Sequence, residues 1–194
     1  FSRSRGLGDV YKRQSEERGA KRQLLKSKFI GLLKKYYKSS NKQLYADANG
    51  TLRVTYGNVK AVSLKDGLTY EPFTRLEGIP QKHTGEEPFN ASDKLLNLIN
   101  KKDYGDYYYE PVNSVPVNFL STLDITNGNS GSATINSDFE LVGLAFDGML
   151  ETIIADYKYI PEARTISVDS RYFLWTLDKL ENAENILEEL SITN

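Results

Sequence analysis

The chain has 194 residues, of which 39% are hydrophobic and 26% are charged, and its formal net charge is −1. It has no cysteine and a single histidine, which excludes a disulfide framework and a thiolate zinc site and argues against a transition-metal site. No apolar run approaches the ~18 residues that a membrane helix needs. We therefore expect no metal, no cofactor and no membrane partner.

The near-zero net charge hides an asymmetry along the chain. Residues 1–38 carry twelve Lys and Arg against three Asp and Glu, whereas the remainder has a net charge of −10. A basic block can indicate nucleic-acid binding. Because no nucleic-acid motif accompanies it, we interpret the block as a solvated helix face plus foreign sequence and expect no nucleic-acid partner.

The first fourteen residues do not have the layout of a signal peptide, because no apolar stretch follows the basic residues. They resemble the translated library-adapter sequence found at the ends of assembled metagenomic reading frames. We therefore predict that 1–14 is non-native sequence and that the chain is a fragment of a longer gene product.

Residues 15–38 are predicted to form an amphipathic helix with a basic outer face, which Ser39-Ser40-Asn41 ends. A lone helix does not hold such a face together, so the apolar face needs a partner surface. Its apolar residues recur at three- to five-residue spacing: Leu24, Leu25, Phe29, Leu32, Leu33, Tyr36 and Tyr37.

The next part of the chain changes to short strands and turns. Apolar and polar residues alternate with period two over residues 51–56, which predicts a strand. Residues 59–64 predict a second strand. Residues 66–90 are rich in Gly, Pro and charge, and we interpret them as a long loop. Ser92 is a candidate N-cap for the short apolar helix that follows it.

Residues 115–120 predict a strand that leads toward Ser130. Residues 133–135 and 140–146 then predict a hairpin, with Asn136-Ser137-Asp138 as its turn. The tail, Asp169 to Leu190, has apolar residues at helical spacing, and an asparagine, Asn182, is expected to break or cap it midway. The sequence therefore predicts a mainly β chain with helices.

Gly128-Asn129-Ser130-Gly131-Ser132 is the candidate site. A nucleophilic serine needs a base and preorganised donors for the oxyanion that it creates. The small residues let the chain turn tightly, so that the N–H groups of Gly128 and Ser130 can point into one cavity, and the return strand brings Phe146-Asp147-Gly148 beside the serine. The alternative is a simple hairpin turn, but the flanking strands favour a nucleophile loop.

The histidine, His83, is a candidate base by residue type. Its setting, Gln81-Lys82-His83-Thr84-Gly85, is that of a surface loop. We therefore predict a surface-loop histidine rather than a catalytic one.

Several blocks in order along the chain together resemble a known family. From about residue 15 onward the chain resembles the C-terminal part of bacterial dipeptidyl-peptidases of the 7 and 11 type, the family-46 serine peptidases. The blocks are Tyr45-Ala46-Asp47-Ala48-Asn49, Thr51 to Gly57, Asp124-Ile125-Thr126, Gly-Asn-Ser-Gly-Ser, Gly143 to Gly148, and Ile166-Ser167-Val168-Asp169.

The resemblance implies an architecture for the whole chain. Residues 45–194 would be the C-terminal β-barrel half of a chymotrypsin-like double barrel, closed by a C-terminal helix, and residues 15–44 the end of a helical domain that precedes it. The catalytic His and Asp would lie upstream, so the isolated fragment is expected to be inactive. The family also implies peptide substrates with a free N-terminus, a periplasmic location and a homodimer as the possible assembly.

The resemblance also assigns roles to site residues. Ser130 would be the nucleophile that forms the acyl-enzyme, with the Gly128 and Ser130 amides as the oxyanion hole. Asp147, with Phe146 beside it, would hold the free α-amino group of the peptide, because a carboxylate near an ammonium gives a charge-assisted hydrogen bond. The alternative for Asp147 is a turn-capping carboxylate.

Within the resembled family, the residue at position 148 distinguishes enzymes of different substrate specificity. Relatives that cleave after Asp or Glu have an arginine there, whereas Gly148 leaves the pocket open and uncharged, which implies a preference for apolar residues before the scissile bond. Leu123, Asn127 and Ala133 depart from the family pattern and leave open a weakened enzyme, although asparagine tolerates the left-handed backbone. A non-catalytic β-barrel peptide-binding module is the alternative function, and a trypsin-like endopeptidase is a weaker one.

Overall fold

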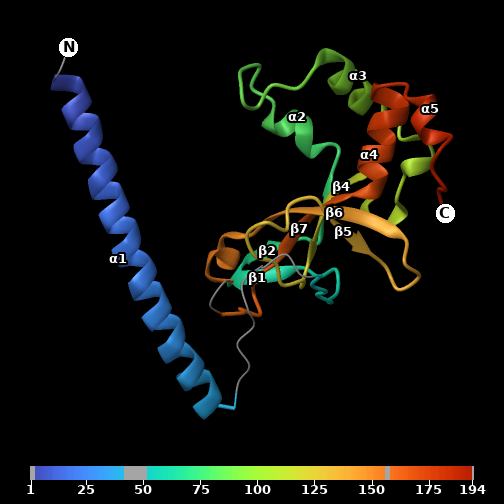
Figure 1. Ribbon diagram of the computed structural model, residues 1–194. Coiled ribbons are helices and arrows are strands. Elements are labelled where there is room, and N and C mark those ends of the chain that lie inside the picture. Colours follow the sequence, from blue (N-terminus) through green and yellow to red (C-terminus); the bar gives the residue numbers. More distant parts are fainter. Residues whose placement is uncertain (1–2, 42–51, 156–157, 194) are drawn as a thin grey trace. The chain divides into compact units, whose positions relative to one another are not determined.

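The computed structural model describes residues 3–41, 52–155 and 158–193, with side chains from residue 15 onward (Figure 1). The chain divides into two units, residues 1–46 and 47–194, which we describe separately. The sequence block at residues 45–49 lies outside the described residues. No helix in the described ranges combines the length and the apolar character that a membrane span requires.

The first unit is one long helix, α1 (Arg3–Ser39). The helix predicted for residues 15–38 is thus confirmed, and it continues toward the N-terminus into the segment interpreted as adapter sequence. The non-native origin of that segment stays a prediction. The apolar side chains of α1 remain largely accessible within this unit, with Leu24, Phe29 and Leu32 exposed by 58%, 50% and 66%.

The second unit combines helices with an antiparallel sheet (Figure 1). Five strands pair in the order β3-β4-β7-β6-β5, and β1 and β2 form a separate hairpin. The strands are β1 (Val62–Lys65), β2 (Leu68–Tyr70), β3 (Phe73–Arg75), β4 (Pro116–Ser121), β5 (Ser132–Ile135), β6 (Leu141–Gly148) and β7 (Thr165–Asp169). The helical segments are α2 (Gly78–Lys82), α3 (Asp93–Lys101), η1 (Gly105–Tyr107), η2 (Glu110–Val112), η3 (Leu150–Ile154), α4 (Ser170–Trp175), η4 (Thr176–Leu180) and α5 (Glu184–Leu187).

The sheet stays open over the described residues, so the closed β-barrel predicted for residues 45–194 is not found. A barrel closes only when its two edge strands pair. Here the edges are β3 and β5, with three and four residues, at opposite ends of the strand order. The observed architecture is a mixed helix and antiparallel-sheet unit.

Two predictions in the first part of this unit are wrong. Residues 52–56 form no strand, and Leu52 and Tyr56 are 93% and 92% exposed, because alternation marks a half-buried surface but does not supply a pairing strand. The predicted loop at 66–90 contains β2, β3 and α2. The second strand, expected at 59–64, is β1 and begins only at Val62.

The local signals in the rest of the chain are confirmed. The Ser92 hydroxyl accepts the N–H of Leu95 at 3.3 Å and caps α3. The β5–β6 hairpin turns at Asn136, whose Oδ1 accepts the N–H groups of Asp138 and Glu140, both at 2.9 Å. The helical tail is interrupted between η4 and α5, where Asn182 adopts a positive φ of 51°.

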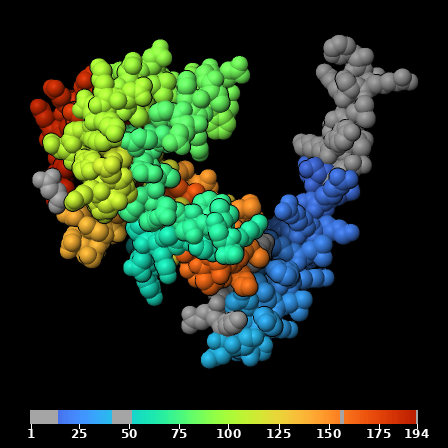
Figure 2. All heavy atoms as spheres, turned by 180° about the vertical axis from the view of Figure 1, so that it is seen from behind, coloured from blue at the N-terminus to red at the C-terminus, as the bar shows by residue number. Residues whose placement is uncertain are grey.

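The hydrophobic core lies between the β3–β4 edge of the sheet and the helices α3 and α4. Its centre is Trp175, which is fully buried and donates its Nε1–H to the carbonyl oxygen of Asp103 at 2.8 Å. Figure 2 shows the red C-terminal helices beside the yellow-green segment that holds α3 and η1. The other buried members of the cluster are Leu76, Ile99 and Val115.

Candidate active site

The C-terminal end of β6 carries a bulge. Ala145 pairs with Ser167 and Asp147 pairs with Ile166, so two steps along β6 correspond to one step along β7. Such bulges re-aim side chains and are frequent beside active sites. This one shifts the register at Phe146, where the predicted wall residues begin, and the pairing with β7 resumes at Asp147 and Gly148.

The loop that carries Ser130 is shaped by its neighbours. Gly128 and Gly131 have φ values of +94° and +85°, a backbone conformation that glycine adopts without steric cost. The side-chain oxygen of Asn129 accepts the N–H of Thr126 at 2.9 Å and closes the loop. The N–H of Gly131 donates to the carbonyl oxygen of Ala145 at 2.7 Å and ties the loop to β6.

Three N–H groups of this loop, those of Asn127, Gly128 and Ser130, have no acceptor among the described residues. Those of Asn129 and Ser132 donate to the carbonyl oxygens of Thr126 at 3.3 Å and Asn129 at 2.9 Å. The unpaired donors thus include the two predicted for an oxyanion hole, and that role stays a prediction.

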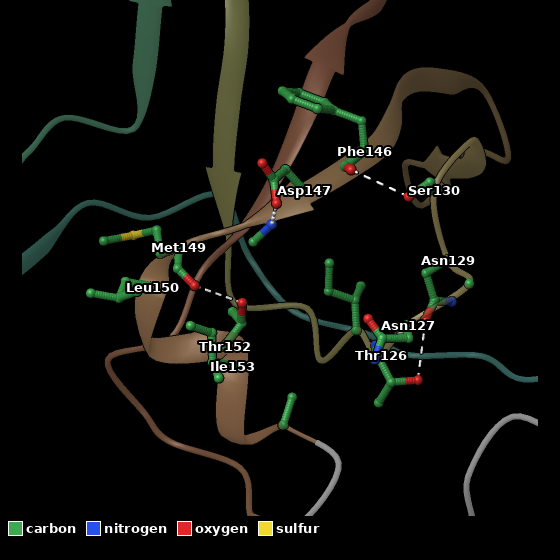
Figure 3. A pocket seen from close by; sticks show the side chains of 14 residues that line it. Thr126, Asn127, Asn129, Ser130, Phe146, Asp147, Met149, Leu150, Thr152 and Ile153 are labelled. Carbon is green, nitrogen blue, oxygen red and sulfur yellow. Dashed lines mark hydrogen bonds between the residues drawn. The ribbon is translucent and has the colours of Figure 1, made fainter. Parts of the chain in front are cut away.

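Ser130 and every predicted wall residue border one cavity of about 470 Å³ (Figure 3). Ser130 is exposed, and its hydroxyl makes a long contact of 3.4 Å to the carbonyl oxygen of Phe146. The cavity thus joins the loop to the end of β6 and to η3. It is lined by Ile125, Thr126, Asn127, Gly128, Asn129, Ser130, Phe146, Asp147, Gly148, Met149, Leu150, Thr152, Ile153 and Ala155.

Asp147 makes the turn-capping contact that was the alternative for this residue, and its role as an anchor for the α-amino group stays a prediction. Its Oδ1 accepts the N–H of Gly148 at 2.8 Å, which is the local capping contact. The side chain is nevertheless exposed on the cavity wall. Of the described residues that line the cavity, Asp147 is the one with an ionisable carboxylate, so a cationic ligand group would meet it there.

The space beside Gly148 is not open, contrary to the expectation from its sequence. A Cβ atom added to Gly148 would clash with Oγ1 of Thr152 and lie 2.9 Å from both its Cβ and its Cγ2. The wall is uncharged here, but Thr152 fills it. Sequence reasoning missed Thr152, because no motif marks it and only the turn from β6 into η3 brings it against Gly148.

The remaining candidates lie outside this chemistry. The Nδ1 of His83 accepts the N–H of Ala91 at 3.0 Å, so His83 closes a loop as expected and is absent from the cavity lining. Of the three departures, Asn127 lines the cavity, the carbonyl of Leu123 accepts the Thr165 hydroxyl at 2.7 Å, and Ala133 lies on β5. Among the described residues there is no cluster of metal-ligating side chains.

The site combines a serine, unpaired backbone donors and a carboxylate, which defines a candidate hydrolase site. The sequence profile of the family described as Peptidase S46 matches residues 9–192. The chain belongs to the peptidase S46 family.

Relatives with two different names match the chain. An Asp/Glu-specific dipeptidyl-peptidase of Shewanella putrefaciens is 44% identical over 84% of this chain and 25% of its own length. A dipeptidyl-peptidase 7 of Phocaeicola vulgatus is 40% identical over 85% of this chain and 24% of its own length. The chain therefore spans about a quarter of the length of these relatives.

The structural comparison agrees with the family. The crystal structure of Porphyromonas endodontalis DPP11 in complex with the dipeptide Arg-Asp has a TM-score of 0.67 and 36% sequence identity to this chain. The match covers 70% of this chain and 20% of that one. The chain is thus similar in structure to one part of that larger protein.

Proposed function

We propose that this chain supplies the nucleophile-bearing part of a serine dipeptidyl-peptidase, which releases dipeptides from the free amino end of peptides. The observation that carries the proposal is one cavity bordered by Ser130, by the unpaired N–H groups of Gly128 and Ser130, and by the carboxylate of Asp147. The membership of the chain in a peptidase family supports the same reading.

In the proposed reaction, the Ser130 hydroxyl oxygen attacks the carbonyl carbon of the second peptide bond. Its proton passes to a histidine base outside this chain, and the carbonyl oxygen takes up negative charge against the N–H groups of Gly128 and Ser130. Loss of the leaving amine, which takes the proton from the base, gives a dipeptidyl ester on Ser130. Water then hydrolyses this acyl-enzyme by the same route.

Asp147 gives the proposed enzyme its register on the substrate. A peptide whose second carbonyl lies at Ser130 has its α-ammonium group two residues away, and the exposed carboxylate of Asp147 borders the same cavity. A charge-assisted hydrogen bond between the two favours a free amino end over a blocked one. Phe146, the neighbour of Asp147, contributes apolar contact to the first residue.

We also propose that the residue before the scissile bond is apolar. Relatives named for Asp/Glu specificity and relatives named dipeptidyl-peptidase 7 match this chain at 44% and 40% identity, so overall similarity does not select between them. The cavity wall favours the apolar preference, because Met149, Leu150 and Ile153 line it and its described residues include no Lys, Arg or His. An acidic side chain would have no cation to pair with.

A peptide-binding module without catalysis is the second candidate. It is favoured by one observation: no histidine of the described residues lies at the cavity, so Ser130 has no base there. The same cavity would then hold the amino end of a peptide without cleaving it. The periplasmic location and the homodimer that the resemblance implies stay predictions.

The decisive experiment uses the complete protein, with this chain joined to the upstream part of its reading frame. We expect fluorophosphonate labelling and cleavage of dipeptidyl reporters with an apolar second residue. Ser130→Ala is expected to abolish labelling and to reduce turnover by at least about 10³-fold. Ser132→Ala is the matched control, since Ser132 is an exposed serine on β5 outside the cavity lining. This variant should keep both the fluorophosphonate labelling and the reporter turnover.

Blocking the amino end of the reporters separates the enzyme classes. N-acetylated reporters are expected to be cleaved at least about tenfold more slowly, because a neutral amide cannot form a charge-assisted hydrogen bond with Asp147. Equal rates on free and acetylated reporters would contradict the anchor and favour an endopeptidase. Labelling that persists in Ser130→Ala would mean that another serine is the nucleophile, and binding of the reporters without any cleavage would favour the peptide-binding module.

A further inference from the structure

We propose that Thr152 is a second specificity-determining residue, which acts together with Gly148 to set the depth of the pocket for the residue before the scissile bond. The inference rests on the proposed function. Both residues line the cavity that Ser130 borders, and they come from different elements, the end of β6 and η3 (Figure 3).

The contact between the two residues is steric and close. A Cβ atom at position 148 would clash with Oγ1 of Thr152 and lie 2.9 Å from its Cβ and Cγ2. Two carbon atoms at that separation are well inside their contact distance of about 3.5–4.0 Å. Position 148 can therefore carry a side chain only if Thr152 gives way.

Thr152 is fixed in its place. Its N–H and its hydroxyl both donate to the carbonyl oxygen of Met149, at 2.8 and 2.6 Å. A β-branched side chain also has few rotamers to choose from. Rotation away from Gly148 would break the hydroxyl bond, so the methyl and hydroxyl groups form a rigid part of the wall.

The backbone of Gly148 does not itself require glycine. Its φ lies outside the left-handed range that disfavours side chains, unlike that of Gly128 or Gly131. The three atoms nearest to a Cβ at position 148 all belong to Thr152, so Thr152 is the first obstacle to a side chain there. The two positions are thus coupled, and a change at either one alters the same volume of the pocket.

The coupling has a consequence for substrates. With Thr152 in place, the wall is shallow at this point and suits small or medium apolar side chains. With a smaller residue at 152, the pocket is deeper and takes larger apolar side chains such as Phe or Met. One extra methylene in such a pocket is worth roughly 10- to 200-fold in discrimination, so the shift is measurable.

The test is a double-mutant cycle in the complete protein, with Gly148→Ala, Thr152→Gly and the two combined, each assayed for kcat/KM on dipeptidyl reporters with Ala, Val, Met or Phe in second place. We expect Gly148→Ala to lower kcat/KM for all reporters about tenfold and Thr152→Gly to raise the Phe-to-Val ratio about tenfold. The combined variant should recover most of the activity lost in Gly148→Ala. Thr152→Ser, which keeps the hydroxyl and removes Cγ2, should raise the ratio by a smaller factor.

Thermal unfolding of the same variants supplies a readout that needs no activity. Gly148→Ala is expected to lower Tm, and adding Thr152→Gly should restore part of the loss. Gly78→Ala is the matched control, because a Cβ atom there meets no atom within 4 Å, and it should leave Tm and activity unchanged. If Gly148→Ala does not fold, recovery of folding in the combined variant supports the inference and continued failure overturns it.

The two proposals fail in different ways. Additive effects in a wild-type enzyme that does cleave the reporters would overturn the coupling and leave the proposed function intact. A wild type that cleaves no reporter would overturn the proposed function and the specificity role with it, whatever the unfolding data show.

Discussion

The helical end of the second unit and the end that holds the cavity differ in how deeply their apolar side chains are buried. At the helical end, Leu76, Val115 and Trp175 are fully buried around one core. At the cavity, Leu150 and Ile153 are each 77% exposed. The stability of this unit is therefore concentrated at one end, and the proposed chemistry at the other.

The connections that hold the two regions are also of different kinds. The core is held by packing and by long-range contacts such as the one from the N–H of Leu76 to the carbonyl oxygen of Val115 at 3.2 Å. The Ser130 loop is held by short-range contacts, above all the side chain of Asn129 on Thr126, and by the bond from Gly131 to β6. Substitutions in one region should therefore leave the other largely unaffected.

The largest effect is expected from truncation of the core. Trp175→Ala removes a fully buried side chain and its hydrogen bond to Asp103, and such truncations cost about 3–5 kcal/mol. Thermal or urea unfolding of the chain measures it. Phe139→Ala, at an 84% exposed position of the β5–β6 hairpin, is the control and should stay within about 0.5 kcal/mol. A cost below about 1 kcal/mol for Trp175→Ala would refute the location of the core.

An intermediate effect, on kcat, is expected from a substitution in the Ser130 loop. In the complete protein, Asn129→Leu removes the acceptor for the N–H of Thr126, so the Gly128 and Ser130 donors lose their fixed position and kcat falls about 10- to 100-fold. Tm should change little, because no residue of the loop belongs to the buried core cluster. Asn129→Asp keeps a side-chain oxygen acceptor and should retain more activity than Asn129→Leu. Equal losses in both variants would show that the acceptor is not what positions the loop.

The same contrast explains which parts of the fold were predictable from sequence. The β5–β6 hairpin and the capped helix α3 follow from signals a few residues long, the Asn136 turn and the Ser92 cap. Strand β3 was missed, because three residues are too few to show a period and its pairing with β4 joins positions more than forty residues apart. The strand expected at 51–56 had the right pattern, but its described residues have no pairing strand.

The site was predictable to a similar degree. Ser130, Gly128 and Asp147 could be placed together, because glycines mark the loop and one hairpin returns the wall to it. The role of Thr152 could not be seen, because it depends on how tightly the chain turns from β6 into η3. Residue types predict such a contact only when the backbone between them is regular, and the bulge at the end of β6 is not.

The smallest effect on the free energy of unfolding is expected from a substitution of Glu77, which lies beside the core. Its carboxylate accepts hydrogen bonds from the hydroxyls of Tyr104 and Ser114, the latter at 2.7 Å. Burial raises the pKa of Glu77, but these two bonds, together with a backbone hydrogen bond and the charge of Arg75, outweigh it and hold the pKa below the ordinary 4.5. A lowered pKa means that the carboxylate stabilises the fold above pH 4.5 and that this contribution is lost as the pH falls through the lower folded-state value.

Glu77→Gln should therefore cost about 1 kcal/mol at pH 7, a value reduced from that of a buried charged hydrogen bond because solvent screens a partly exposed carboxylate. The difference from wild type should shrink as the pH falls below 4.5, since the wild type loses the same contribution there. Urea unfolding at pH 7 and at pH 3.5 measures both values, with Glu71→Gln at an exposed position as the control. A difference that grows toward low pH would reverse the sign of the linkage and show that the charged form of Glu77 opposes folding. Reporter turnover in the complete protein should be the same for Glu77→Gln and wild type at pH 7, because Glu77 packs beside the core cluster and not at the cavity.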